Sequence, residues 1–135
     1  MAFFSTPKRL KPLILHIDDS EDVLMVTEVM LKQVGLDVIG SPRPDEMIPL
    51  AEKHGPDLIL LDVLMPDVSG YIVCRRLKDN AKTKAIPVIM ATSEDTVKDI
   101  EKALSYYGAN EYIIKPFTVE KLKAKIAKFL TLPDS

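Results

Sequence analysis

Five reactive side chains stand at the ends of short apolar runs in this sequence. They are the paired Asp18 and Asp19, the single Asp62, Thr92 and Lys115. Clustered carboxylates raise the pKa of one another unless a cation balances their charge. Mg²⁺, a hard ion that prefers oxygen ligands, meets this need, and Mn²⁺ can take its place. Three carboxylates are too few to enclose such an ion, so we expect water and phosphate oxygens at its remaining positions.

The same set of side chains suits phosphoryl transfer. A carboxylate can act as a nucleophile and form an aspartyl phosphate. The transfer requires in-line placement and neutralisation of the charge on the equatorial oxygens, which a divalent ion, a lysine and a hydroxyl together supply. A lone aspartate at a strand end is usually a cap or a turn residue, and an Asp-Asp pair before a helix can serve only to cap the helix and balance its dipole. Their agreement at four strand ends favours a phosphoryl-transfer site.

The elements that must position these side chains follow from hydrophobic periodicity. The apolar runs are nearly continuous, which is typical of strands buried on both faces, and helical spacing separates them. Repeated βα units predict an α/β fold, (βα)₅, in which right-handed crossovers place helices on both faces of a parallel five-stranded sheet. The predicted strands are Leu13–Ile17, Asp37–Gly40, Leu58–Leu61, Ile86–Met90 and Tyr112–Ile114.

Capping residues and prolines set the helix ends. Ser20 is predicted to cap the first helix, Gly35 to end it, and Thr118 to cap the last helix. The second helix is expected near Glu46–His54, with Pro49 in its first turn or at a kink. For the fourth helix, the spacing predicts that Tyr106 points outward while four residues face the core: Val97, Ile100, Leu104 and Tyr107.

Length and composition narrow the class of protein. The chain has 135 residues, of which 47% are hydrophobic and 28% charged, and its net charge is −2. This is one domain's length with no charge bias toward nucleic acid. The single cysteine excludes an intramolecular disulfide and a multi-cysteine metal site. No run reaches the ~18 residues of a membrane span, and the first residues lack a signal-peptide pattern. We therefore expect a cytoplasmic protein with tails at 1–11 and 132–135 around a domain at 12–131.

Four motifs, in order, resemble the receiver domain of the response regulators of two-component signalling. They are LILHIDDSED, PDLILLDVLMPDVSGY, VIMATS and GANEYIIKPF, and the resemblance extends from about Leu13 to Leu130. In length, the chain resembles the single-domain receivers of the chemotaxis-regulator type. The resemblance implies a flavodoxin-like three-layer sandwich with strand order 2-1-3-4-5. It also implies that the protein is not an enzyme, apart from its own Mg²⁺-dependent phosphorylation and dephosphorylation.

The resemblance assigns the phosphorylation chemistry by position. It implies that Asp62 is the phosphoacceptor. Asp18 and Asp19 would hold Mg²⁺ together with Asp62 and the backbone carbonyl of Leu64. Lys115 would contact a phosphoryl oxygen, and the peptide bond after this lysine is typically cis in the family.

The resemblance also assigns the residues of the conformational switch. Thr92 would follow the phosphoryl group, and Tyr112 would be the aromatic residue whose orientation reports activation. Leu64 and Glu94 would flank the approach of water and tune dephosphorylation, which we expect to be slow because a leucine cannot orient water. The stretch from Thr92 to Lys115 is one residue longer than usual, which places an extra residue in the fourth helix or its entry loop.

Together these features predict a phosphorylation-dependent signalling protein. A stand-alone receiver, with no attached output module, would accept its phosphoryl group from a sensor histidine kinase or a histidine phosphotransfer protein. It would then change its affinity for a downstream protein through the surface of the fourth helix, fifth strand and fifth helix. Neither direct nucleic-acid binding nor a membrane span is expected.

Three alternatives remain at this stage. A phosphate sink or phosphorelay intermediate without its own effector has the same motifs. A flavin-binding redox module is disfavoured, because Asp18, Asp19, Glu21 and Asp22 would repel a flavin phosphate. A phosphatase with an aspartyl nucleophile would need a second aspartate where Leu64 stands.

Two further reactive residues are interpreted as structural. His16, on the first predicted strand, is interpreted as a core histidine rather than a phosphohistidine. Cys74, on the third predicted helix, is interpreted as a small apolar residue rather than a reactive thiol. The last helix is basic, and either solvent or an acidic partner is expected to cover its lysines: Lys121, Lys123, Lys125 and Lys128.

Overall fold

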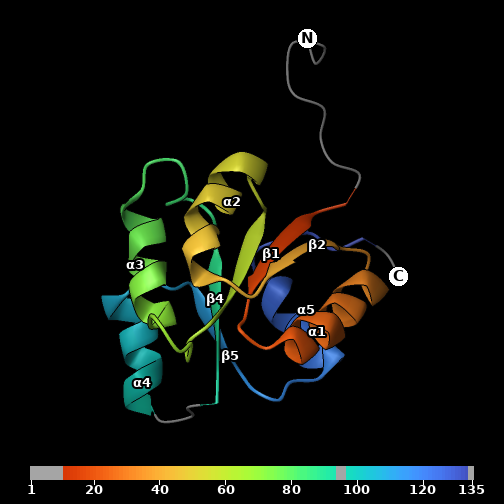
Figure 1. Cartoon of the computed structure of the whole chain (residues 1–135). Coiled ribbons are helices and arrows are strands. Elements are labelled where there is room, and N and C mark those ends of the chain that lie inside the picture. The colour runs from red at the N-terminus through yellow and green to blue at the C-terminus, as the bar shows by residue number, and fades with distance from the viewer. Residues whose placement is uncertain (1–10, 94–96, 134–135) are drawn as a thin grey trace.

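The computed structural model describes residues 11–93 and 97–133. Five parallel strands form one sheet in the order β2-β1-β3-β4-β5, which confirms the predicted α/β fold and topology (Figure 1). Glu94 and the predicted N-terminal tail up to residue 10 lie outside the described residues. The strands are β1 (Leu13–Ile17), β2 (Asp37–Ser41), β3 (Leu58–Asp62), β4 (Val88–Thr92) and β5 (Glu111–Ile114).

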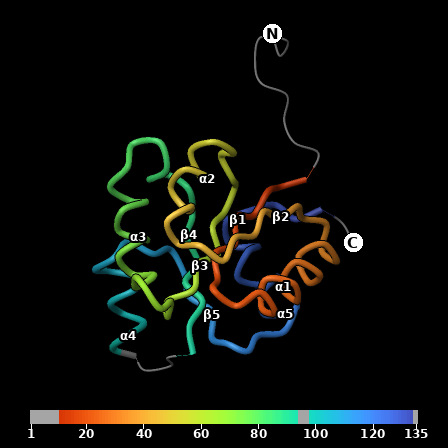
Figure 2. The backbone as a smooth tube through the Cα atoms, viewed as in Figure 1, coloured from red at the N-terminus to blue at the C-terminus, as the bar shows by residue number. Residues whose placement is uncertain are grey.

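Helices cover both faces of the sheet, and Figure 2 traces the path between them. One face is covered by α1 (Glu21–Gln33) and α5 (Val119–Ile126), as Figure 1 shows. The other face is covered by α2 (Met47–His54), α3 (Gly70–Asp79) and α4 (Val97–Glu101). A short 3₁₀ turn, η2 (Pro44–Glu46), precedes α2, and a π turn, η3 (Lys102–Tyr106), continues α4. None of the helices in the described ranges is long and apolar enough to cross a membrane.

The central strands explain the continuous apolar runs of the sequence. Every residue of β1, β3 and β4 is buried, because neighbouring strands lie on both sides and helices on both faces. Alternate residues point to opposite faces. Leu15 and Ile17 pack with the α2 and α3 side chains, whereas Ile14, Leu58 and Leu60 pack with those of α1 and α5.

The boundaries predicted for the fourth strand were wrong. The strand is β4, Val88–Thr92, rather than Ile86–Met90. Pro87 carries no backbone N–H, so it cannot donate a hydrogen bond within a central ladder. The shift makes the threonine the last residue of its strand, just as Asp62 is the last residue of β3. Two of the predicted site residues are therefore held by the sheet itself.

The predicted helix caps are confirmed. The Ser20 hydroxyl accepts a hydrogen bond from the backbone N–H of Val23 at 3.3 Å, and the Thr118 hydroxyl accepts one from Lys121 at 3.2 Å. Gly35, with φ of 84°, follows the end of α1 in the left-handed conformation that glycine adopts without strain. These caps fix where α1 and α5 begin next to the strand ends.

The core-facing set predicted for the fourth helix was wrong at Leu104. This side chain is 38% exposed, and Ala103 is buried instead. The cause is the π turn Lys102–Tyr106, in which the Tyr107 N–H bonds the carbonyl of Lys102 at 3.1 Å. A π turn holds one residue more than an α turn and so shifts the side chains that follow around the helix axis. It lies in the segment for which the sequence predicts one extra residue.

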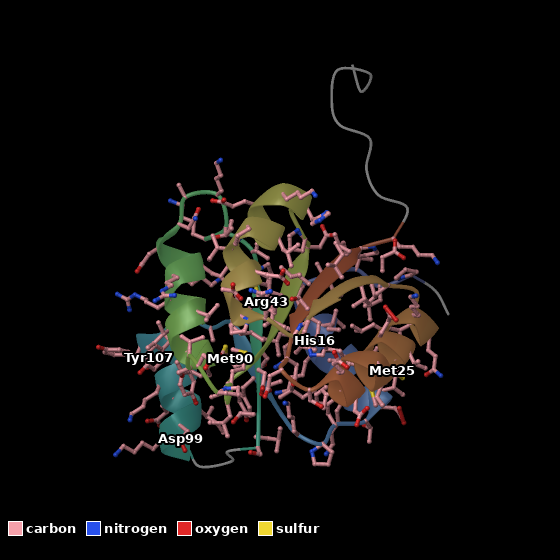
Figure 3. The ribbon with its side chains drawn as sticks, viewed as in Figure 1. His16, Met25, Arg43, Met90, Asp99 and Tyr107 are labelled. Carbon is pink, nitrogen blue, oxygen red and sulfur yellow. The ribbon has the colours of Figure 1, made fainter. Side chains whose placement is uncertain are left out.

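Side chains of α3 hold the end of this π turn. Tyr106 is 66% exposed, as predicted, and Tyr107 stacks on Tyr71 with ring centroids 4.7 Å apart (Figure 3). Arg75 Nη1 donates to the Tyr106 carbonyl at 2.7 Å, and the Cys74 thiol donates to the Tyr107 carbonyl at 3.4 Å. Burial raises the pKa of this thiol to about 11, which agrees with a structural rather than a reactive cysteine.

Candidate functional site

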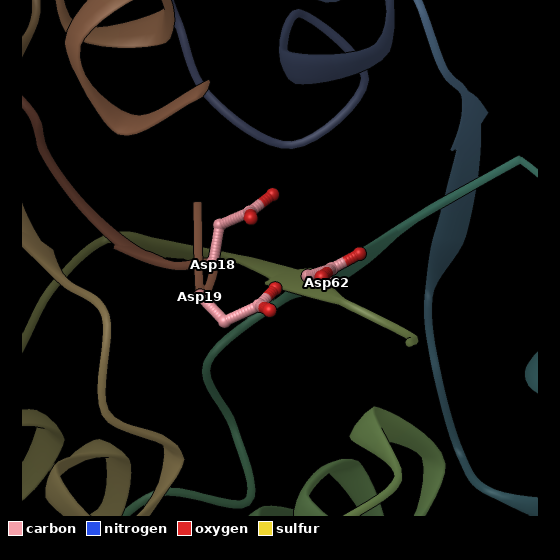
Figure 4. Close-up of side chains that lie close together, drawn as sticks. All are labelled: Asp18, Asp19 and Asp62. Atoms are coloured by element: carbon pink, nitrogen blue, oxygen red, sulfur yellow. The ribbon is translucent and has the colours of Figure 1, made fainter. Parts of the chain in front are cut away.

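Three carboxylates meet at the carboxyl end of the sheet. Asp18 and Asp19 follow β1, and Asp62 ends the adjacent strand β3, where Ile17 is paired with Leu61. Figure 4 shows the three side chains, and each has a carboxylate oxygen within 4.8 Å of the others. Asp18 and Asp62 are buried, whereas Asp19 is exposed. The structure therefore brings the predicted acidic cluster together.

Lys115 joins this cluster from the end of β5. Its Nζ donates to Asp18 Oδ2 at 2.7 Å and to Asp62 Oδ1 at 2.8 Å. The lysine backbone N–H donates to the carbonyl of the buried Thr92 at 2.8 Å, and the peptide bond that follows the lysine is cis. The other oxygen of Asp18 accepts a hydrogen bond from the Ser20 N–H at 3.0 Å. Both buried carboxylates are thus fixed in orientation.

Burial and charge both shift the pKa values of this cluster. Burial raises the pKa of Asp62 to about 6; the hydrogen bond from Lys115 opposes this rise, and the carboxyls of Asp18 and Asp19 add to it. Burial lowers the pKa of Lys115, but its hydrogen bonds to the two buried carboxylates outweigh burial and leave this pKa above its usual value. One ammonium does not balance three carboxylates.

The donor set of this cluster fits a divalent cation. Carboxylate oxygens are the ligands that Mg²⁺ selects, and the site offers three of them within 4.8 Å of one another. The exposed Asp19 leaves one side of the cluster open to solvent. Leu64, whose backbone carbonyl is the remaining predicted ligand, lies in the loop after β3 with an exposed side chain. Its role as a ligand stays a prediction.

Gly70 is a site residue that the sequence reasoning missed. Its N–H donates to the Val63 carbonyl at 2.8 Å, so that α3 begins against the end of β3. A Cβ atom at this position would lie 2.0 Å from the Asp62 carbonyl oxygen. The available signal was a glycine at the start of a predicted helix, directly after the capping Ser69.

The two predicted switch residues lie on neighbouring strands. Thr92 is paired with Ile114, and Tyr112 is paired with Met90 two residues away. Since side chains alternate along a strand, the Thr92 hydroxyl and the Tyr112 ring project from the same face of the sheet. Tyr112 is half-buried and packs against the core cluster on the side of α2 and α3. Glu94, the other predicted tuning residue, lies outside the described residues.

His16 lies inside the fold on β1, two residues before Asp18, and is 1% exposed (Figure 3). Burial lowers its pKa to about 4, so the ring is neutral, and neither ring nitrogen has a hydrogen-bond partner among the described residues. A ring so enclosed is not accessible to a phosphoryl donor. The interpretation of His16 as a core histidine is confirmed.

An apolar groove borders the acidic cluster on the side of α1. Its volume is about 460 Å³, and Lys115 lines it together with Val26, Met30 and Phe117. Met25, on the same helix, is exposed to solvent (Figure 3). The sequence analysis did not identify this surface.

Comparison with known proteins agrees with the geometry. The profile of the response regulator receiver domain matches residues 14–127. Protein PilG of Pseudomonas aeruginosa is 37% identical over 114 residues, which cover 84% of this chain and 83% of PilG. The chain spans about half the length of the probable transcriptional regulators that it also matches.

Solved structures give the same assignment. Chemotaxis protein CheY4 of Vibrio cholerae superposes with a TM-score of 0.83 at 25% identity, over 89% of this chain and 99% of that chain. The receiver domain of the sensor histidine kinase PA1611 from Pseudomonas aeruginosa, with a magnesium ion coordinated in its active-site cleft, gives 0.80 at 27% identity, over 88% and 97%. Fold, pocket and family profile agree, and the chain belongs to the response regulator receiver domains of two-component signalling.

Proposed function

We propose that this protein accepts a phosphoryl group on Asp62 from a phosphohistidine of a sensor histidine kinase or a histidine phosphotransfer protein. Receiver domains generally signal rather than turn over substrates. The observation that carries the proposal is the Lys115 ammonium, which lies 2.7 Å from Asp18 and 2.8 Å from Asp62 beside the third carboxylate. This arrangement offers a nucleophile together with positive charge for phosphoryl oxygens.

The transfer exchanges one bond to phosphorus for another. A bond forms between a carboxylate oxygen of Asp62 and phosphorus, the P–N bond of the donor breaks, and its electron pair returns to the imidazole nitrogen. Lys115 favours the charged form of the nucleophile before the transfer and neutralises a phosphoryl oxygen after it.

A divalent cation completes the proposed site. We propose that Asp18, Asp19, Asp62 and the backbone carbonyl of Leu64 hold Mg²⁺, or Mn²⁺ in its place. Such an ion supplies Lewis-acid neutralisation of phosphoryl charge when it is bound. The receiver domain of PA1611, with magnesium in its cleft, supports this assignment.

The groove beside α1 supports a protein as the donor. Its apolar lining, which includes Val26 and Met30, ends at Lys115. A helical donor that covers this groove would exclude water and hold its phosphohistidine in line with the Asp62 carboxylate.

Phosphorylation is proposed to act on a downstream protein through Thr92 and Tyr112. The hydroxyl moves toward the new phosphoryl oxygens, and the ring turns into the vacated space, which changes the surface of α4, β5 and α5. Leu64 and Glu94 are proposed to slow hydrolysis. That the protein acts as a stand-alone receiver stays a prediction.

Phosphorylation with a small donor tests the proposal. Phosphoramidate contains the P–N bond of the natural donor type, and with Mg²⁺ it should add one phosphoryl group to the protein, measured by intact mass. Asp62→Asn should stay unmodified. Asp67→Asn, which removes an exposed carboxylate from the loop after β3, should be modified like the parent. Equal modification of Asp62→Asn and the parent would refute the assignment.

A further inference from the structure

A buried carboxylate at the start of β5 gathers two lysines of the last helix. The Glu111 side chain is only 10% exposed. Its Oε1 accepts hydrogen bonds from the Tyr112 N–H at 2.9 Å and forms an ion pair with Lys125 Nζ at 3.2 Å, and its Oε2 accepts from Lys128 Nζ. Burial raises the pKa of Glu111. The contacts with Lys128, the Tyr112 N–H and Lys125 together lower it by more, so the pKa lies below its usual value. This carboxylate is a fixed negative charge under α5.

The same ion pair places an ammonium over the predicted switch ring. Lys125 Nζ lies 4.4 Å from the centroid of the Tyr112 ring. Its side chain is only 25% exposed, so water screens the contact less than at an open surface. A cation within about 6 Å of an aromatic face is attracted by the ring quadrupole. Lys125 therefore contacts Glu111 by charge and Tyr112 through the ring.

The position of β5 explains how one lysine reaches both residues. This strand is at the edge of the sheet, beside α5 (Figure 1). Adjacent residues of a strand point to opposite faces, so Glu111 faces α5 and the Tyr112 ring faces the side of α2 and α3. Lys125 extends from α5 around the open edge of the strand. No other strand lies between its ammonium and the ring.

We propose that Lys125 is a positioning residue, held by Glu111, that keeps the Tyr112 ring in the orientation seen here and so opposes activation. The inference rests on the proposed function, in which the ring turns toward Thr92 after phosphorylation. In that step the ring leaves the position in which Lys125 Nζ lies 4.4 Å from its centroid, so the contact is lost. A contact of this strength changes the ratio of the two orientations by about two- to fivefold.

The test follows the Tyr112 ring directly. The protein is labelled with 3-fluorotyrosine, and the ¹⁹F signal of Tyr112 is assigned by its loss in Tyr112→Phe. Beryllofluoride, an analogue of the phosphoryl group, is then titrated in the presence of Mg²⁺. Lys125→Met keeps the aliphatic stem and removes the ammonium. We expect this variant to convert at a beryllofluoride concentration about two- to fivefold lower than the parent does.

Two matched variants separate positioning from general effects of charge and stability. Lys123→Met makes the same change of charge at an exposed position of α5 and should titrate like the parent. Lys125→Arg retains a cation over the ring, so its beryllofluoride midpoint should lie close to that of the parent. Salt weakens the ion pair with Glu111, so the difference between Lys125→Met and the parent should shrink at high ionic strength.

The outcomes distinguish this inference from the proposed function. If the parent ring responds to beryllofluoride and Lys125→Met has the same midpoint as Lys123→Met, Lys125 does not position the ring and the inference is wrong. If the parent Tyr112 signal does not respond at all, the proposed switch and the inference both fail. A lower midpoint in Lys125→Met, restored in Lys125→Arg, supports the inference.

Discussion

In the acidic pocket, the one ammonium of Lys115 lies against two buried carboxylates, and a third carboxylate stands at the solvent side. Burial and the neighbouring carboxylates disfavour the charged form of Asp62, and the ammonium only partly offsets them. A divalent cation removes this repulsion, and so does the loss of one carboxylate. Removing one carboxylate should therefore weaken metal binding but should not lower the stability of the metal-free protein.

Asp19→Asn tests this balance at a single residue. The change removes a proposed ligand and relieves repulsion with Asp62, while the exposed side chain keeps its shape. We expect Mg²⁺ affinity to fall at least about tenfold, measured by calorimetric titration. The melting temperature in metal-free buffer should stay level or rise. Unchanged Mg²⁺ affinity would show that the acidic pair serves only to cap α1.

The pKa of Asp62 predicts how Mg²⁺ binding depends on pH. A proton and the cation compete for this carboxylate, whose pKa of about 6 in the folded protein exceeds the usual 3.8. Affinity should be about tenfold weaker at pH 5 than at pH 7.5, as expected for competition by one proton. Asp62→Asn should abolish this dependence. A parent affinity equal at both pH values would contradict the assignment of Asp62 as a ligand.

The same shift has a definite sign for stability without metal. Between pH 3.8 and about 6 the folded protein binds more protons at Asp62 than the unfolded chain does. Its contribution to the free energy of unfolding therefore decreases as pH rises through this window. Protonation of Asp62 at acid pH should therefore not destabilise the folded protein.

At the scale of elements, the sequence predicted what depends on a regular period. The continuous apolar runs predicted β1 and β3 because central strands have no solvent-facing positions. The period failed at Leu104, where the π turn changes the residue spacing and brings Ala103 to the core. The prediction from apolar runs was also wrong at Pro87, which is apolar but has no backbone N–H to donate within the sheet, so β4 begins at Val88. Composition alone does not reveal such changes of hydrogen-bond pattern.

Gly70→Ala tests how closely α3 must approach β3. The new Cβ would lie 2.0 Å from the Asp62 carbonyl oxygen, which is backbone and cannot turn aside. We expect the free energy of unfolding to fall by at least about 2 kcal/mol in chemical denaturation. Ser69→Ala, which removes only the hydroxyl cap of the same helix, should cost about 1 kcal/mol. A smaller loss for Gly70→Ala than for Ser69→Ala would contradict the close approach.

At the scale of the whole molecule, topology made the site predictable. Parallel strands end at one edge, so residues after three separate strands had to converge there, and Asp18, Asp62 and Lys115 do. The contact of Lys125 with the Tyr112 ring had no sequence signal, because it depends on how far α5 reaches over the edge strand. Side-chain contacts around the edge of a sheet can be identified only from the packed structure.

Thr92→Ala tests whether the pocket communicates with the output surface. The variant keeps the acceptor and the lysine, so phosphoramidate should still modify it. Without the hydroxyl, the phosphoryl group has no group to draw inward, and the ¹⁹F signal of Tyr112 should no longer respond. Ser93→Ala removes the neighbouring exposed hydroxyl and should respond like the parent. A full Tyr112 response in Thr92→Ala would place the switch elsewhere.

The position of the phosphoryl group is the most direct test of the central claim. Borohydride reduces an aspartyl phosphate to homoserine, which marks the modified residue permanently for peptide mass mapping. After phosphorylation with Mg²⁺ and phosphoramidate, we predict homoserine at position 62 and at no other position. Homoserine at position 18 or 19, or a phosphoryl group retained on His16 with no homoserine, would contradict the account.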